Sequence, residues 1–224
     1  MGRAMPQNNP EEIRADYDRV ADEYARNLFR ELEGKPLDRE LLARFADLVK
    51  DCGTICDMGC GPGHVARLLH DHGADVFGLD LSPRMVGLAL SLNPGISFRE
   101  GNMLELDLED ASLAGITAFY AIVNIPAGSL PQVCREMFRV LEPAGVLLLA
   151  FHIGEEVIRP KELWGNPISM EFYHLQPDRI CRLLADAGFV IDDVTEREPY
   201  APEVEYQSRR AYILARKPVA SPGI

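Results

Sequence analysis

The sequence has few cysteines and no spacing in which they would pair. Its five cysteines form no C-x-x-C motif and are odd in number, so neither a disulfide framework nor a zinc site is predicted. Cys56 and Cys181 fall on apolar faces, where a thiol acts as a small buried hydrophobic group. Cys60 lies inside a glycine-rich loop that needs small residues, and we expect it to pack there rather than to act as a catalytic thiol.

Long apolar runs and basic runs are also missing. The longest apolar stretch, 145–151, is far shorter than the roughly 20 residues that span a bilayer, and the N-terminus lacks the apolar core of a signal peptide. Lys and Arg number 23 against 35 Asp and Glu, and no basic run is interleaved with aromatic residues. We therefore expect a cytoplasmic protein that binds neither membranes nor nucleic acid.

The length of the chain limits the number of domains. With 224 residues and 47% hydrophobic content, it is long enough for one well-buried α/β domain and too short for two. No repeat or low-complexity segment divides it. We predict one domain over 1–224, with disordered ends at 1–10 and 218–224, and a monomer or a homodimer.

The stretch 54–63, Thr-Ile-Cys-Asp-Met-Gly-Cys-Gly-Pro-Gly, organises the chain. An apolar strand leads into Gly59, Gly61 and Gly63, and an apolar helical pattern follows at once. Glycine is needed where the backbone turns with positive φ or approaches a ligand closely, so we expect a ligand against this loop. The dinucleotide fingerprint G-x-G-x-x-G would need glycine where His64 stands, which disfavours NAD.

A second predicted strand, 75–79, ends in Asp80 about twenty residues beyond the loop. In a βαβ unit this position delivers a carboxylate to a ribose diol. The alternative role for Asp80 is to cap the helix that begins near Pro83. Ser82 suits that role better, because proline follows it at the first helical position. Asp80 is therefore predicted to bind a ribose.

The pattern D-x-G-x-G-x-G, which runs from Asp57 to Gly63, resembles motif I of the class I S-adenosylmethionine (SAM) methyltransferases. The pattern R-V-L-x-P-x-G-x-L-L-L at 139–149 is similar to the fifth-strand motif of the same family, and the resemblance covers roughly 17–216. It implies SAM as the cofactor, S-adenosyl-L-homocysteine (SAH) as the product, and an Asp and a glycine loop around the cationic methionine end of SAM.

The resemblance also implies further cofactor-binding residues. The segment 17–24 resembles a Y-x-x-x-A-x-x-Y helix that many small-molecule methyltransferases lay over the SAM pocket as a lid, although two tyrosines on a helix can also be simple packing. Asn102 stands where the family commonly has Asp, and its carbonyl can still accept from the adenine amine. The predicted set is Tyr17, Tyr24, Asp57, Gly59, Cys60, Gly61, Gly63, Asp80, Leu81, Met85, Asn102, Met103, Phe119 and Tyr120.

The order of apolar patterns predicts the fold. β-α units in register with a glycine loop, followed by strands at 190–194 and 211–215 with no helix between them, indicate a doubly wound, Rossmann-like α/β sheet of seven strands under an N-terminal helical lid. In the family that the chain resembles, the last strand usually runs antiparallel, and we expect this for 211–215. The aromatic stretch 153–175 leaves the carboxyl edge of the sheet and is a candidate substrate cover.

The predicted function is methyl transfer from SAM to a small organic acceptor, bound by Asn124, Glu155, Trp164 and Tyr173. His152 follows the fifth strand directly and is the first candidate for a general base, with His174 second, because an unperturbed histidine pKa near 6.5 suits proton removal. His152 could equally be a hydrogen-bonded wall residue, and some acceptors need no base. A SAM-binding protein without catalysis and, less favoured by the glycine spacing, an NAD-linked oxidoreductase remain as alternatives.

Overall fold

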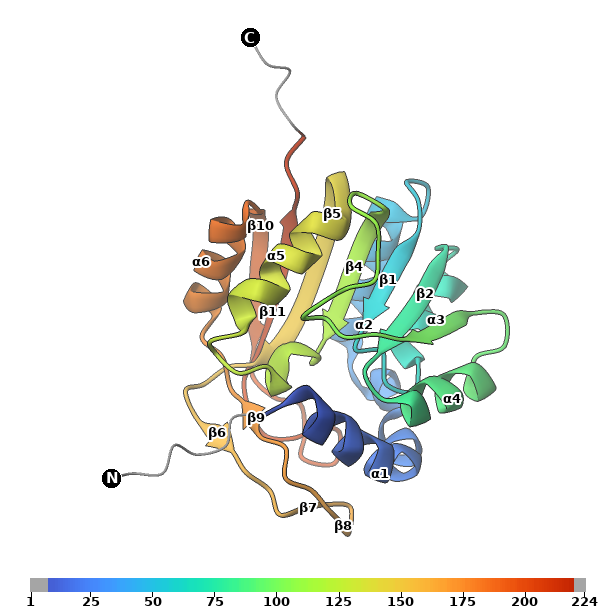
Figure 1. The fold of residues 1–224 in the computed structure, drawn as a ribbon, viewed down its shortest axis with the longest axis vertical. Coiled ribbons are helices and arrows are strands. Elements are labelled where there is room, and N and C mark those ends of the chain that lie inside the picture. The colour runs from blue at the N-terminus through green and yellow to red at the C-terminus, as the bar shows by residue number, and fades with distance from the viewer. Residues whose placement is uncertain (1–7, 220–224) are drawn as a thin grey trace.

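A seven-stranded sheet forms the centre of the structure, a computed structural model in which residues 8–219 are described (Figure 1). The strand order is β10-β11-β5-β4-β1-β2-β3. Of these strands, β11 pairs antiparallel with both of its neighbours, whereas the pairs from β5 to β3 are parallel. The predicted doubly wound sheet with an antiparallel last strand is confirmed.

The bounds of the elements follow the predicted patterns closely. The sheet consists of β1 (Ile55–Met58), β2 (Val76–Asp80), β3 (Ser97–Glu100), β4 (Leu113–Phe119), β5 (Leu141–His152), β10 (Val190–Arg197) and β11 (Arg210–Arg216). The helices are α1 (Pro10–Leu28), α2 (Pro36–Val49), α3 (His64–Asp71), α4 (Pro83–Leu92), α5 (Leu130–Val140) and α6 (Pro177–Ala187), with short turns at η1 (Glu31–Gly34) and η2 (Ile122–Asn124). Within residues 8–219, no helix has both the length and the apolar character to cross a membrane.

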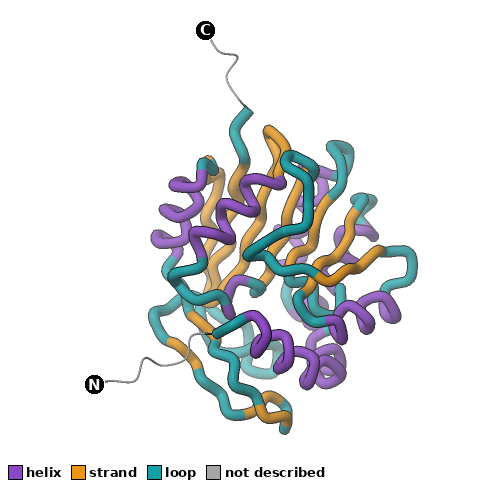
Figure 2. Tube along the Cα trace, viewed as in Figure 1, coloured by secondary structure: helices purple, strands orange, loops and turns teal. Residues whose placement is uncertain are grey.

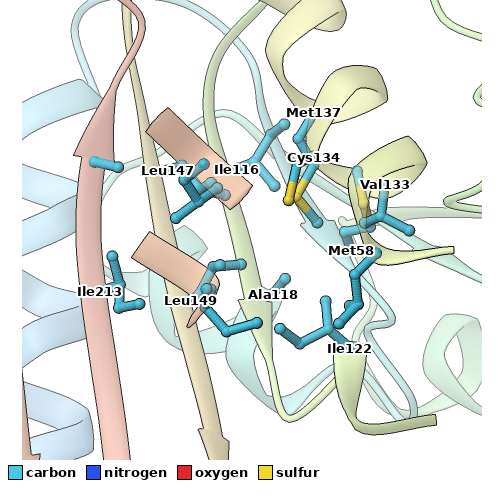
Figure 3. Packing of buried hydrophobic residues seen from close by; sticks show 14 of the residues in the cluster. Met58, Ile116, Ala118, Ile122, Val133, Cys134, Met137, Leu147, Leu149 and Ile213 are labelled. Carbon is cyan, nitrogen blue, oxygen red and sulfur yellow. The ribbon is translucent and has the colours of Figure 1, made fainter. Parts of the chain in front are cut away.

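Helices cover both faces of the sheet (Figure 2). One buried cluster joins the sheet to α5 and α6, and another joins it to α2, α3 and α4. The continuous apolar run in β5 follows from this, because Leu147 and Leu149 face the first cluster while Leu148 faces the second. Figure 3 shows Met137 and Cys134 of α5 packed toward Ile116 of β4 in the first cluster.

α1 lies across the carboxyl ends of the central strands (Figure 1). The side chain of Asn9 accepts from the N–H groups of Glu11 and Glu12 and caps the helix, which begins at Pro10. The Asn8 amide donates to the carbonyls of Asn124 and Glu171, at 2.8 Å each. The expected disorder at 1–10 is therefore wrong for 8–10, because these residues are tied down; 1–7 and 220–224 lie outside the described residues.

The predicted cover contains two short strand pairs, and one of them contacts α1 through β8 (Asn166–Pro167). The pairs are β6 (Val157–Ile158) with β9 (Phe172–Tyr173) and β7 (Glu162–Leu163) with β8. Asp16 on α1 is 3% exposed and accepts from the backbone N–H groups of Ser169 and Met170, at 2.6 and 2.8 Å. Although burial opposes ionisation, these bonds and Arg19 hold the pKa of Asp16 below its usual value. The helix and the cover are thus joined over one edge of the sheet.

Candidate active site

The loop between β1 and α3 has a left-handed backbone at its three glycines. Gly59, Gly61 and Gly63 have φ of 71°, 51° and 84°. A Cβ at Gly59 would lie 2.5 Å from that of Ala121, and one at Gly63 would lie 2.7 Å from the Phe98 ring, so a larger residue would clash at either position. Gly59 and Gly61 face a cavity, which brings bare backbone to its wall.

This cavity, called the loop cavity, is bounded by the glycine loop, the ends of β2 and β4, and α1. Eleven of the predicted cofactor-binding residues line it, namely Tyr17, Tyr24, Gly59, Gly61, Asp80, Leu81, Met85, Asn102, Met103, Phe119 and Tyr120. Sequence reasoning missed the adjoining Ile13, Gly101 and Ala121, which come from the same segments. The prediction thus named half of the residues that line this cavity.

Asp80 points a carboxylate with spare acceptor capacity toward the loop cavity. Its Oδ2 accepts from the N–H of Gly61 at 2.8 Å and its Oδ1 from the N–H of Ser82 at 2.9 Å. A carboxylate has about four acceptor positions, so two stay free. Burial raises the pKa of Asp80 to about 6, against the hydrogen bonds that lower it. Ser82 caps α4 through the N–H of Met85, as predicted.

Of the predicted cofactor-binding residues, Asp57, Cys60 and Gly63 do not line the loop cavity. Asp57 is 1% exposed and accepts from the N–H of Ala66 at 3.1 Å and from the Thr117 hydroxyl at 3.0 Å. Its carboxylate therefore holds the first turn of α3 to the sheet. Cys60 belongs to the buried cluster beneath the loop, and burial raises the pKa of its thiol.

A second cavity of about 450 Å³, called the cover cavity, lies under the 153–175 insertion. It shares Tyr17, Tyr24 and Tyr120 with the loop cavity, so these rings form a common wall. Tyr120 directly follows β4 and has φ 54°, which is unfavourable for a residue with a side chain. Its hydroxyl donates to Asp38 at 3.2 Å, which fixes the ring between the two cavities.

Only some of the predicted catalytic and acceptor-binding residues meet at the cover cavity. His152, His174 and Trp164 line it. Asn124 lines the loop cavity instead, where it accepts from the Tyr17 hydroxyl at 2.7 Å. Glu155 and Tyr173 line neither cavity, because Glu155 is exposed and the Tyr173 hydroxyl donates to Glu171. The structure therefore does not bring these three residues together with His152, His174 and Trp164.

His152 does not have the ordinary pKa on which the general-base prediction rested. Burial, together with the nearby Arg210, His174 and Lys35, lowers its pKa to about 3. Its ring stacks on that of His174, with centroids 5.5 Å apart, and its Nδ1 lies 2.7 Å from the Ser208 hydroxyl. A neutral histidine of this kind is a weak proton acceptor.

Sequence reasoning missed four charged side chains that line the cover cavity, namely Glu31, Lys35, Glu205 and Arg210. Lys35 Nζ lies 2.6 Å from Glu31 and 3.7 Å from Glu205, and Arg210 lies 3.3 Å from Glu205. The two basic and two acidic side chains compensate one another. One signal was available: in an antiparallel last strand, the residue before 211 pairs with the end of the fifth strand, and Arg210 indeed pairs with His152.

Comparison with known proteins gives consistent matches. Residues 55–145 match a family model described as a methyltransferase domain. The demethylmenaquinone methyltransferase of Chlorobaculum tepidum is 35% identical over 67% of this chain and 60% of that protein. The malonyl-(acyl-carrier protein) O-methyltransferase of Enterobacter lignolyticus is 26% identical over 71% of this chain and 61% of that protein. The chain spans about half the length of the curated relatives it matches.

The fold itself occurs in proteins with more than one activity. The crystal structure of the cyclase SpnF matches with a TM-score of 0.73 at 18% identity, covering 97% of this chain and 100% of that one. Similarity at that identity concerns the fold alone. The family follows instead from the matched model, the relatives and the D-x-G-x-G-x-G loop, which agree. The chain belongs to the class I S-adenosylmethionine-dependent methyltransferase family.

Proposed function

We propose that this protein transfers a methyl group from SAM to a small organic acceptor. The observation that carries the proposal is the pair of cavities that meet at Tyr17, Tyr24 and Tyr120. The loop cavity takes the cofactor and the cover cavity takes the acceptor. The two cavities adjoin at these side chains, so a cofactor in one and an acceptor in the other lie next to each other, as a direct transfer needs.

The residues of the loop cavity fit SAM. Gly59 and Gly61 offer backbone without side chains, which allows a ligand to approach closely. Asp80 keeps free acceptor positions for the two hydroxyls of a ribose, while Leu81 and Met103 supply apolar contacts for a flat base. When bound, SAM supplies an activated methyl group on a sulfonium.

The chain contributes alignment and exclusion of water. α1 and the cover are joined by buried hydrogen bonds of Asp16 and Asn8, so they enclose the two cavities together. Holding two reactants in attack geometry supplies roughly 7 to 11 kcal/mol of the barrier reduction in favourable cases. The proposed reaction therefore needs little general acid or base catalysis by side chains.

The cover cavity suits a partly apolar acceptor. Trp164, Phe172 and Leu163 line one side of it, and the charges of Lys35 and Arg210 are matched by nearby carboxylates. Because these positive charges are paired with carboxylates, the cavity has no excess positive charge that would attract a polyanion. The names of the relatives, which refer to quinone and acyl-carrier-protein acceptors, are compatible with an organic acceptor of this kind.

The test combines binding with turnover on the full chain. Isothermal titration with SAM, SAH and NADH measures the cofactor, and methyl-labelled SAM incubated with fractionated metabolite pools measures transfer. SAM binding with transfer supports the proposal. SAM binding without transfer to any fraction would instead indicate a binding protein, and binding of NADH but not SAM would contradict both assignments. The similarity to a cyclase makes the turnover measurement necessary.

A further inference from the structure

Three side chains beside the cover cavity form a hydrogen-bonded chain. Arg210 Nη1 donates to the Ser208 hydroxyl at 2.6 Å, and that hydroxyl lies 2.7 Å from His152 Nδ1. Arg210 is 1% exposed and also donates to the carbonyl of Tyr206 at 2.7 Å. The backbones of Arg210 and His152 are partners across β11 and β5, so the sheet register holds this chain in place.

The direction of each bond follows from counting donors. A guanidinium has donors only, so the Ser208 oxygen must accept from Arg210. The hydroxyl hydrogen of Ser208 then needs an acceptor, and His152 Nδ1 is within reach. If Nδ1 carried the proton instead, Ser208 would accept twice, and its own hydrogen would have no partner among the side chains of residues 8–219.

This arrangement favours one neutral tautomer of His152. A neutral imidazole that accepts at Nδ1 carries its proton on Nε2. Burial, reinforced by Arg210, His174 and Lys35 and opposed by Glu205, lowers the pKa of His152 to about 3, so the ring is neutral near pH 7. Nε2 makes no hydrogen bond to any side chain or backbone group in residues 8–219, and the ring lines the cover cavity.

The surroundings of His152 favour a flat ligand. The ring of Tyr120 lies 5.1 Å from it at a tilt, that of His174 stacks on it, and that of Tyr206 meets it edge-on at 5.9 Å. Trp164 and Phe172 line the same cavity. Aromatic walls of this kind prefer aromatic ligands in stacked or edge-on contact.

We infer that His152 donates a hydrogen bond from Nε2–H to an oxygen atom of the acceptor, and that the acceptor is an oxygen-bearing aromatic molecule. This inference rests on the proposed function, which makes the cover cavity the acceptor site. His152 then orients the acceptor and takes up no proton from it. Ser208 and Arg210 are positioning residues, since they act by holding the tautomer of His152.

The first test measures the tautomer and needs neither SAM nor turnover. The full chain is labelled with nitrogen-15 in its histidines, and long-range proton–nitrogen spectra are recorded at pH 7. His152→Gln identifies the His152 signals among the five histidines. We expect a protonated Nε2 and a bare Nδ1, and a mixture of tautomers in Ser208→Ala. A protonated Nδ1 in the unaltered chain would overturn the inference, whatever the outcome of the methyl-transfer assay.

The second test uses a matched pair of probes, 2-naphthol and naphthalene, with SAH present. We expect 2-naphthol to bind about three- to tenfold more tightly, the effect of one hydrogen bond. Glutamine can place an N–H near the position of Nε2, so His152→Gln should keep the preference, whereas His152→Phe should lose it. If the unaltered chain does not prefer 2-naphthol, or if His152→Phe keeps the preference, the donor role is wrong.

Discussion

At the scale of the residue, Asp80 accepts from the N–H of Gly61 in the glycine loop and from the N–H of Ser82 at the cap of α4, and it keeps acceptor capacity for a ligand. Replacing it by asparagine leaves one acceptor oxygen where two backbone N–H groups, of Gly61 and Ser82, now bind. A hydrogen bond to a charged group contributes about 1.5–3 kcal/mol, so we expect Asp80→Asn to weaken SAM binding roughly ten- to hundredfold. Titration calorimetry measures this. The control is Asp107→Asn, the same change at an exposed site; equal losses in both variants would contradict the role of Asp80.

The same carboxylate makes SAM binding depend on pH. Burial raises the pKa of Asp80 to about 6, so below that value the free protein holds a proton that must leave before the carboxylate can accept from SAM. Affinity should be constant above about pH 7 and should fall up to tenfold per pH unit below 6. Asp57 titrates in the same range. Asp80→Asn separates the two, because it should abolish the decline if Asp80 causes it.

Asp57 is predicted to contribute stability rather than binding. In Asp57→Ala, the N–H of Ala66 and the hydroxyl of Thr117 lose a buried acceptor. Each unsatisfied donor costs about 1–3 kcal/mol, and urea unfolding should show a loss of that order for each. Thr117→Val removes one of the two donors, so adding it to Asp57→Ala should recover part of the loss. Unchanged stability in Asp57→Ala would show that the carboxylate does not hold the loop.

The sequence predicted best those site residues that stand next to glycines or at strand ends. Asp80 and His152 end β2 and β5, and Tyr120 directly follows β4, so their location at the carboxyl edge follows from the order of the strands. Lys35 and Glu205 could not be found in this way. They lie in connections between elements and reach the site through tertiary packing, which no local pattern encodes. The pKa of His152 was mispredicted for the same reason, since burial causes it.

At the scale of the element, Asp16 is a buried polar link between α1 and the cover, beside the apolar contact of Val20 with Ile168 and Met170. Asp16 receives the N–H groups of Ser169 and Met170 and the Ser169 hydroxyl. We expect Asp16→Ala to loosen both elements and to raise the dissociation rate of SAM roughly tenfold or more, from the loss of charged hydrogen bonds.

The single tryptophan gives a direct signal for this experiment. Trp164 lies in the cover, edge-on to Tyr24 of α1 with ring centroids 5.7 Å apart. Stopped-flow fluorescence therefore follows the two elements when SAM is displaced by excess SAH. Glu12→Gln, an exposed change on the same helix, is the matched control. Equal dissociation rates in Asp16→Ala and the control would show that Asp16 does not hold the lid.

The strands of the cover could not be predicted from the periodicity of apolar residues. They are two residues long, so they leave no alternating pattern to read. The start of helix α4, in contrast, was predicted correctly at Pro83, because a serine cap and a proline at the first position define it.

At the scale of the whole molecule, the strand order follows from a few constraints. Parallel βα units need helical crossovers, and the absence of a helix between the last two strands indicates a hairpin-like return. The antiparallel direction of β11 came from the family resemblance, and the pairing confirms it. What the sequence left open is how the segments outside the sheet, α1 and 153–175, close over it.

The common wall of Tyr17, Tyr24 and Tyr120 has a kinetic consequence. SAM in the loop cavity would pack against these rings and close that side of the acceptor site, so we expect the substrates to add in a fixed order, SAM first. SAH should then leave last. In initial-rate measurements, SAH should inhibit competitively against SAM and noncompetitively against the acceptor. In binding measurements, SAM should raise the affinity for the acceptor by the same factor by which the acceptor raises the affinity for SAM. Random addition of the substrates would contradict this, because it would mean that each cavity is complete without the other. With ordered addition, SAH competes for the form of the protein that binds SAM first, so the ratio of SAM to SAH would set the rate of methyl transfer.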